Sequence, residues 1–182
     1  KHIEIIAEVK TKSPFGWESK HTWEELFDIA NNVGDVISIH TDPRWDGSIE
    51  LVKKARSMTD KPILAKGIHE TDEEIERAIR AGADWVLVVG RTPSVYTEKC
   101  MFEPTSLEQI AFAPEGMRMV WNTRDLNMGG LKGETFEDAR KKWKGWLCQA
   151  SHIRTVADIK EGADAVLVGT YLATFADSLN NK

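Results

Sequence analysis

The sequence has few cysteines and no long apolar run. Cys100 and Cys148 are the only cysteines among its 182 residues, and they are far apart, without the spacing of metal ligands. Two free thiols in a reducing, cytoplasmic setting are therefore expected. No stretch approaches the roughly 18 apolar residues of a transmembrane helix, and no apolar segment near the first residue precedes a small-residue cleavage site. The sequence thus predicts neither a membrane span nor a secretory signal.

An excess of basic residues is also missing. The chain has 24 Lys and Arg against 29 Asp and Glu, a formal net charge of −5. Such a chain attracts the phosphates of nucleic acids and anionic membranes poorly, so neither is an expected partner. The 5 histidines are scattered, with no HExxH motif and no close pair, so no metal site is predicted.

Short apolar runs alternate along the chain with polar segments that have helical spacing. The runs are rich in β-branched residues, which is typical of strands buried on both faces, and they cover residues 3–9, 36–39, 62–65, 85–89, 117–121, 146–148 and 165–168. Helices are predicted over residues 22–31, 71–81, 155–161 and 171–179. Thr22 and Thr71 begin the first two, with Glu25 and Glu74 completing capping boxes. This alternation predicts βα units and a parallel sheet.

An internal repeat suggests how many units there are. Residues 81–90 (AGADWVLVVG) resemble residues 161–170 (EGADAVLVGT), which lie 80 residues later in the sequence. At roughly 20 residues per βα unit, a separation of 80 residues equals about four units, which is half of a (β/α)8 TIM barrel. Two similar units of an open, doubly wound sheet are the alternative. Since such barrels typically need about 250 residues, this one must be compact. At least one helix is expected to be shortened or missing, first of all in residues 91–104. No linker divides residues 1–182, which are predicted as one barrel domain.

Polar side chains follow several predicted strands at their carboxyl ends, where reactive groups of parallel barrels gather. Glu8 and Lys10 share one side of the first strand because side chains alternate, so they either face the barrel mouth or form an exposed ion pair on an edge strand. Lys66 ends the third strand and is either an acid or electrostatic clamp, or a lysine that extends into solvent. Glu103, just before Pro104, is either functional or a solvated loop residue.

An anion is the ligand that the remaining polar residues favour. Asn122 and Arg124 share a side of their segment, and an amide beside a guanidinium suits a carboxylate or phosphate, unless Asp125 holds Arg124 in a surface ion pair. Gly169 and Thr170 follow the last strand and precede a helix, so backbone amides, a hydroxyl and the helix dipole favour phosphate there.

Two further sites stand in loops. Ser151 and His152 end the preceding strand and lead toward another helix, and the loops after the last two strands are the usual phosphate site of such barrels. Ordinary βα turns are the alternative at both places. Trp45, in the loop after the second strand, either faces a planar substrate or packs within the loop.

The motifs, taken in order, resemble the indole-3-glycerol phosphate synthase family. They are residues 6–14 (IAEVKTKSP), 46–48 (DGS), 64–66 (LAK), 122–126 (NTRDL), 151–155 (SHIRT) and 164–169 (DAVLVG). The resemblance implies a (β/α)8 barrel of tryptophan biosynthesis. Such a barrel closes the indole ring of 1-(2-carboxyphenylamino)-1-deoxyribulose 5-phosphate with loss of carbon dioxide and water. It also implies a phosphorylated small-molecule substrate and no cofactor.

The resemblance implies a role for each matching position. Lys66 matches the general acid, Glu103 an acid/base, and Glu8 and Lys10 the first-strand pair whose lysine contacts substrate carboxylate or phosphate. Asn122 and Arg124 match residues that hold the anthranilate end of the substrate. Substrate binding is also predicted for Ser13, Trp45 and Ser48, and phosphate binding for Ser151, His152, Gly169 and Thr170.

Three positions depart from the family pattern. Ala150 stands where the family has glutamate, His152 where it has glycine, and Gly67 where it has an acidic residue. The helical extension that covers the mouth in the family is expected to be absent, since the sequence starts at its first strand. The alternatives are another phosphosugar lyase or isomerase, and a barrel that binds a phosphorylated ligand, or a partner subunit at its open mouth, without catalysis.

Overall fold

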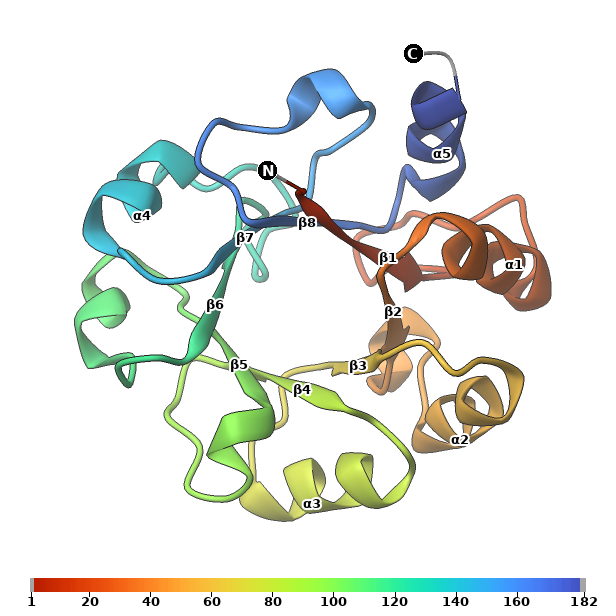
Figure 1. The fold of residues 1–182 in the computed structure, drawn as a ribbon, viewed down its shortest axis with the longest axis horizontal. Helices are drawn as coiled ribbons and strands as arrows, with labels where there is room; N and C mark the ends of the chain where they lie inside the picture. The colour runs from red at the N-terminus through yellow and green to blue at the C-terminus, as the bar shows by residue number, and fades with distance from the viewer. Residues whose placement is uncertain (1, 181–182) are drawn as a thin grey trace.

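The chain folds into a closed ring of eight parallel strands, as the computed structural model of residues 2–180 shows (Figure 1). The strands are β1 Glu4–Val9, β2 Val36–His40, β3 Ile63–Lys66, β4 Trp85–Val89, β5 Cys100–Glu103, β6 Arg118–Asn122, β7 Leu147–Ala150 and β8 Ala165–Val168. Each strand pairs with the next one in sequence, and β8 pairs with β1. The barrel prediction is therefore confirmed. The alternative of an open, doubly wound sheet is wrong, because the ring has no free edge.

The described residues form five α-helices outside the ring. They are α1 Trp23–Val33, α2 Ile49–Met58, α3 Asp72–Arg80, α4 Phe136–Lys142 and α5 Leu172–Asn180. After β4, β5 and β7 the connections contain only short 3₁₀ segments, Thr97–Lys99, Glu108–Phe112 and Val156–Asp158. The expected loss of a helix after β4 is thus confirmed, and two further reductions explain how the barrel fits into so short a chain. Within residues 2–180, no helix combines the length and the apolar character needed to cross a bilayer.

The local signals identified some elements and missed others. Thr22 caps α1 through a complete capping box, and the Thr71 hydroxyl accepts a hydrogen bond from the backbone N–H of Glu74 in α3, as predicted. The helix expected over residues 155–161 is wrong, since only one 3₁₀ turn forms there. The apolar runs did not include β5, and neither α2 nor α4 was predicted.

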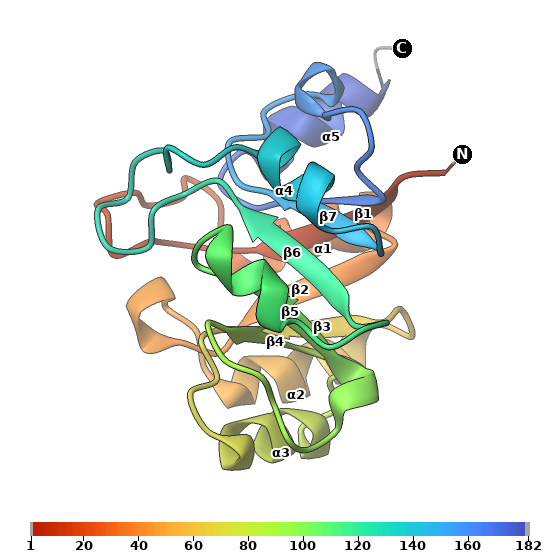
Figure 2. The same cartoon turned by 90° about the vertical axis from the view of Figure 1, so that its left-hand side faces the viewer.

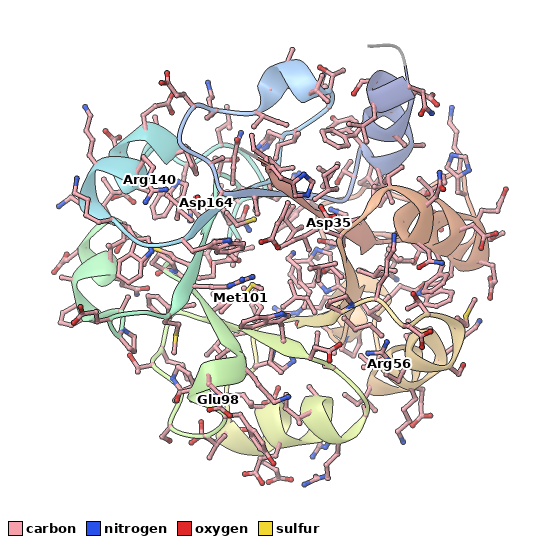
Figure 3. The ribbon with its side chains drawn as sticks, viewed as in Figure 1. Asp35, Arg56, Glu98, Met101, Arg140 and Asp164 are labelled. Carbon is pink, nitrogen blue, oxygen red and sulfur yellow. The ribbon has the colours of Figure 1, made fainter. Side chains whose placement is uncertain are left out.

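Inward and outward side chains form two separate apolar layers. The inward residues fill the middle of the ring, where Met101 is labelled in Figure 3, and they include Ile6, Val36, Leu64, Leu87, Met101, Val120, Cys148, Ala165 and Leu167. Outward residues such as Ile37 and Ile39 pack against the helices. At the amino end of the strands the Arg118 guanidinium lies between the rings of Trp85 and Trp146, 4.6 and 4.5 Å from their centroids. This cation–π contact closes the bottom of the barrel.

The internal repeat corresponds to two equivalent ion-pair networks on opposite sides of the ring. Asp84, before β4, accepts hydrogen bonds at Oδ2 from Arg56 Nη1 and from the backbone of Ile63, both at 2.9 Å. Asp164, before β8, accepts in the same way from Arg140 Nη1 at 3.3 Å and from the backbone of Leu147 at 2.9 Å (Figure 3). Each arginine thereby ties the end of its helix to the start of two strands. The two halves of the barrel are built alike, as the spacing of the repeat indicated.

We expect Asp164→Ala to lower the free energy of unfolding by about 2 kcal/mol, because it removes two hydrogen bonds to Asp164 and leaves the Arg140 guanidinium partly unpaired. Asp84→Ala should cost less, since the Asp84 side chain is 46% exposed against 16% for Asp164. Chemical denaturation followed by tryptophan fluorescence measures both values. Asp177→Ala, on the exposed side of α5, is the control, and equal effects at all three positions would contradict the interpretation.

Candidate active site

The polar residues identified from the sequence continue the inward rows of the strands. Because side chains alternate along a strand, the residue two positions after an inward core residue also faces inward, one layer nearer the carboxyl end. The pairs of core residue and polar residue are Ile6 and Glu8, Leu64 and Lys66, Met101 and Glu103, and Val120 and Asn122. The polar side chains of the site therefore form the layer of the barrel interior that lies nearest the carboxyl ends of the strands.

This layer opens into a cavity at the mouth of the barrel. Its lining includes most of the predicted residues, namely Glu8, Lys10, Trp45, Lys66, Asn122, Arg124, Ser151, His152, Gly169 and Thr170. A second, smaller cavity shares Trp45, Lys66 and Asn122 with the first and adds Glu103. The structure thus brings together residues from strands that are far apart in the sequence.

Ser13 and Ser48 line neither cavity. The Ser13 hydroxyl accepts a hydrogen bond from the backbone of Phe15 within the β1–α1 connection. The Ser48 hydroxyl accepts one from the backbone of Leu51 and caps α2. Substrate binding by these two serines stays a prediction, and a local structural role is visible for both.

Glu8 forms the centre of a buried cluster of charges. Its Oε2 lies 3.2 Å from Lys66 Nζ, and its Oε1 lies 3.3 Å from Nε2 of His40, while the carboxylate side chain is only 2% exposed. Burial acts to raise the pKa of Glu8, but the charge of Lys66 and the contact with His40 outweigh it and hold this pKa well below its usual value. The interpretation of Glu8 and Lys10 as an exposed ion pair on an edge strand is therefore wrong.

Lys10 lies on the same side of β1 as Glu8 and is also buried. Burial lowers the pKa of Lys10 to about 8, against the attraction of Glu8, and the charges of Lys66 and Arg124 act in the same direction as burial. Lys10 therefore carries its positive charge at neutral pH and gives it up at mildly alkaline pH.

Glu103 is buried at the end of β5, so the interpretation as a solvated loop residue is wrong. Its Oε2 accepts a hydrogen bond from Asn122 Nδ2 at 3.3 Å, and its Oε1 has no hydrogen-bond partner among residues 2–180. Burial raises the pKa of Glu103, and the charges of Lys66 and Lys132 only partly offset it. A carboxyl group with a raised pKa keeps its proton to higher pH than an ordinary glutamate, which favours a part in proton transfer.

Asn122 is held by contacts on both ends of its amide. While Nδ2 donates to Glu103, Oδ1 accepts hydrogen bonds from Ser151 Oγ at 2.7 Å and from the backbone N–H of Arg124 at 3.0 Å. The amide orientation is thus fixed, and Ser151 is tied to the same network. Ser151 itself has a left-handed backbone, with φ of 71°.

Arg124 belongs to the connection between β6 and α4, which projects over the mouth together with the β1–α1 connection (Figure 2). The two connections touch, because a Cβ built on Gly129 would lie 2.7 Å from the ring of Phe15. Arg124 Nη1 donates to the backbone oxygen of Gly129 at 3.3 Å. Asp125 caps its own turn instead of pairing with this guanidinium, since its carboxylate accepts hydrogen bonds from the backbone of Asn127 and Met128.

Gly169 leaves room for the carboxylate of Glu8. A Cβ at this position would lie 3.1 Å from both Cδ and Oε1 of Glu8. The sequence suggested only that the backbone here approaches a ligand, so this second reason for a glycine was missed. Thr170 follows at the entrance to α5 and lines the same cavity.

His152 lines the mouth with a left-handed backbone, φ 59°. Its Nδ1 and the hydroxyl of Thr123 share a hydrogen bond of 2.9 Å. Burial and the charges of Arg124 and Arg154 lower the pKa of His152, so the ring is neutral at pH 7. The imidazole is therefore a neutral hydrogen-bonding group beside the predicted phosphate position.

Gly67 and Ala150, two positions at which the sequence departs from the family pattern, each have a structural explanation. A Cβ on Gly67 would lie 2.5 Å from the hydroxyl of Thr41, which shares a 3.1 Å hydrogen bond with His69 Nε2, so a side chain has no room there. Ala150 is buried at the end of β7, where it adds an apolar wall in place of a carboxylate.

Two residues beside the cavities were not identified from the sequence. His40 ends β2 and faces Glu8, but the apolar run on which that strand was predicted stopped one residue earlier. Lys132 stacks on the ring of Trp121 with Nζ 4.6 Å from the centroid and acts electrostatically on Glu103. No local pattern indicated Lys132, which stands in a glycine-rich loop. Within residues 2–180, no cluster of three or more His, Cys, Asp or Glu side chains is arranged to hold a metal ion.

Comparison with known proteins shows the family of the chain. A family model described as indole-3-glycerol phosphate synthase matches residues 1–103, which is more than half of the chain. The chain belongs to the indole-3-glycerol phosphate synthase family. The resemblance seen in the motifs is thereby confirmed, and the matched segment carries Glu8, Lys10, Lys66 and Glu103.

Named relatives agree with this membership. The indole-3-glycerol phosphate synthase of Thermococcus kodakarensis is 39% identical over 93 residues, 48% of this chain and 40% of the relative. That of Nautilia profundicola is 33% identical over 103 residues, 54% of this chain and 40% of the relative. The tryptophan biosynthesis protein TrpCD of Archaeoglobus fulgidus is 25% identical over 186 residues, 91% of this chain and 34% of the relative. The matches thus span well under half the length of these indole-3-glycerol phosphate synthase relatives.

We expect Gly169→Ala to lower the free energy of unfolding by about 1–2 kcal/mol, because the added methyl group presses on the buried Glu8 carboxylate. Gly130→Ala is the matched control: a Cβ there meets nothing within 4 Å, so that variant should be nearly neutral. Thermal and chemical unfolding measure the difference. A Gly169 variant as stable as the Gly130 variant would show that Glu8 adjusts without cost.

Proposed function

We propose that this chain is an indole-3-glycerol phosphate synthase. It would close the indole ring of 1-(2-carboxyphenylamino)-1-deoxyribulose 5-phosphate with release of carbon dioxide and water. The observation that supports this most strongly is the convergence of Lys10, Lys66, Glu103 and Arg124, from four separate strands and connections, on the joined cavities at the mouth.

The charges at the mouth complement those of the substrate. The substrate carries a carboxylate at its aromatic end and a phosphate at its sugar end. The mouth offers three cations, Lys10, Lys66 and Arg124, and only Glu8 is held firmly ionised among its carboxyl groups, since burial raises the pKa of Glu103. We assign the carboxylate to Arg124 and Lys10, and the phosphate to the wall formed by Gly169, Thr170, Ser151 and His152.

The proposed reaction then uses two acid–base groups of the smaller cavity, Lys66 and Glu103, in turn. Lys66 donates a proton to the ketone oxygen while the ring carbon that bears the carboxylate forms a bond to the ketone carbon. Loss of carbon dioxide returns the electron pair and restores the aromatic ring. Glu103 takes the proton from the methylene carbon that joins the nitrogen to the former ketone carbon. Lys66, protonated again from solvent, gives the hydroxyl the second proton with which it leaves as water. Both groups are already placed in the shared cavity lining, so the barrel supplies orientation as well as charge.

Ala150 supports a second candidate function, a barrel that binds the phosphorylated ligand without turning it over. The end of β7 here is an apolar wall, where the resemblance leads one to expect a carboxylate. Binding of the substrate with a phosphate-dependent affinity, in the absence of any turnover, would favour this candidate.

We expect Lys66→Ala and Glu103→Gln each to lower kcat by about 10²–10⁴-fold, the usual contribution of a placed proton donor or acceptor. The assay mixes purified protein with the carboxyphenylamino substrate and follows indole fluorescence. Lys141→Ala and Glu115→Gln, both exposed and away from the mouth, are the matched controls and should keep full activity. Turnover that survives both site variants would sink the assignment of these roles.

The pKa of Lys10 predicts an alkaline limit to activity. Below pH 8 the ammonium is protonated and attracts the anionic substrate, and above it the charge is lost, so kcat/KM should fall as the pH rises through about 8. In Lys10→Met this limb should disappear and kcat/KM should be low throughout. Lys12→Met, on the exposed β1–α1 connection, should keep the limb. A limb that persists in the Lys10 variant would belong to another group.

A further inference from the structure

His40 is a buried histidine in the mouth that the proposed reaction does not use. It ends β2, it is 4% exposed, and its inward direction follows from Val36 and Ser38 on the same side of the strand. It lines the smaller cavity together with Lys66 and Glu103. A buried imidazole in such a place requires a physical reason, because an unpaired polar ring costs free energy.

The ring of His40 packs against an aromatic neighbour, and its nearest charged neighbour is the carboxylate of Glu8. The imidazole stacks on Trp45, with ring centroids 5.0 Å apart and an angle of 5° between the planes. Nε2 lies 3.3 Å from Glu8 Oε1, and neither ring nitrogen has another hydrogen-bond partner among residues 2–180. Oε1 of Glu8 has none either, whereas Oε2 pairs with Lys66.

We propose that His40 is a positioning residue that holds the Glu8 carboxylate at the mouth, with its neutral imidazole donating from Nε2 toward Oε1. This assigns each oxygen of Glu8 its own partner, Lys66 on one side and His40 on the other. Trp45 prevents the ring from turning away. The site concerned is that of the proposed function, but the contact is a property of the protein without substrate.

The electrostatics agree with a neutral donor. Burial lowers the pKa of His40 to about 4, although Glu8 acts to raise it, so the ring carries no charge near pH 7. The Nε2–H tautomer then points a proton at the carboxylate, whereas the other tautomer would turn a lone pair toward it. The charged groups that act on Glu8 are Lys66 on β3 and Lys10, the residue after its own strand, with Glu103 farther across the mouth. The backbone of Gly169, the residue after β8, also approaches Glu8.

The first test uses the unaltered protein. Long-range ¹H–¹⁵N spectra at pH 7 report the tautomer of each histidine, with assignment by comparison with His40→Gln. We expect a neutral ring protonated at Nε2. A ring protonated at Nδ1 alone, or a charged imidazolium, would overturn the proposal, and this result does not depend on any enzymatic activity.

The second test compares two substitutions. His40→Leu removes the donor, while His40→Gln places an amide N–H close to the position of Nε2. In ¹³C titrations of glutamate carboxyl groups, Glu8 should stay ionised in the wild type and in His40→Gln over the accessible pH range, and its pKa should rise in His40→Leu because one stabilising partner is lost. Unchanged Glu8 titration in a folded His40→Leu variant would contradict the proposal.

The activity measurement rests on the proposed function. We expect His40→Leu to lower kcat on the order of tenfold with little change in KM, as for loss of one hydrogen bond to a charged group, and His40→Gln to recover most of it. Equal losses in the two variants would show a packing role only. If the wild type has no turnover, the proposed function fails, but the tautomer and the Glu8 titration still decide the role of His40.

Discussion

Closure of the ring is the constraint on which the site depends. In an open sheet the inward rows of distant strands would end at different places, whereas in a closed parallel barrel they all end at one mouth. The pairing of β8 with β1 brings Gly169 beside Glu8, and the pairing of β2 with β3 brings His40 beside Lys66. Residues separated by more than a hundred positions therefore share one cavity without any long connecting segment.

The same mouth gives its two carboxyl groups opposite properties. Glu8 has a lysine and a histidine in contact and stays ionised, so it serves as a fixed negative charge. Glu103 receives a single hydrogen bond, from Asn122, and burial dominates, so its proton is held more firmly. Environment rather than residue type thus separates a structural anion from a group suited to proton transfer.

The barrel reaches this arrangement with little material outside the ring. Three of its connections contain only 3₁₀ segments, yet the strands remain in register. Equivalent aspartate–arginine networks before β4 and β8 tie helix ends to strand starts in both halves, and Arg118 packs between two tryptophans at the bottom. These stabilising contacts lie at the amino ends of the strands, whereas the buried charges lie at the carboxyl ends, in the mouth.

The sequence by itself determined what depends on near neighbours. Thr22 and Glu25 mark a helix start because a cap is satisfied within one turn, and the alternation of Ile6, Glu8 and Lys10 places both charges inside because a strand has period two. The resemblance to the family motifs implied roles for these residues. Only the tertiary structure decided that His40 touches Glu8, that Lys132 acts on Glu103, and that Gly169 leaves room for a carboxylate. Those facts depend on contacts between strands and loops, which no spacing along the chain encodes.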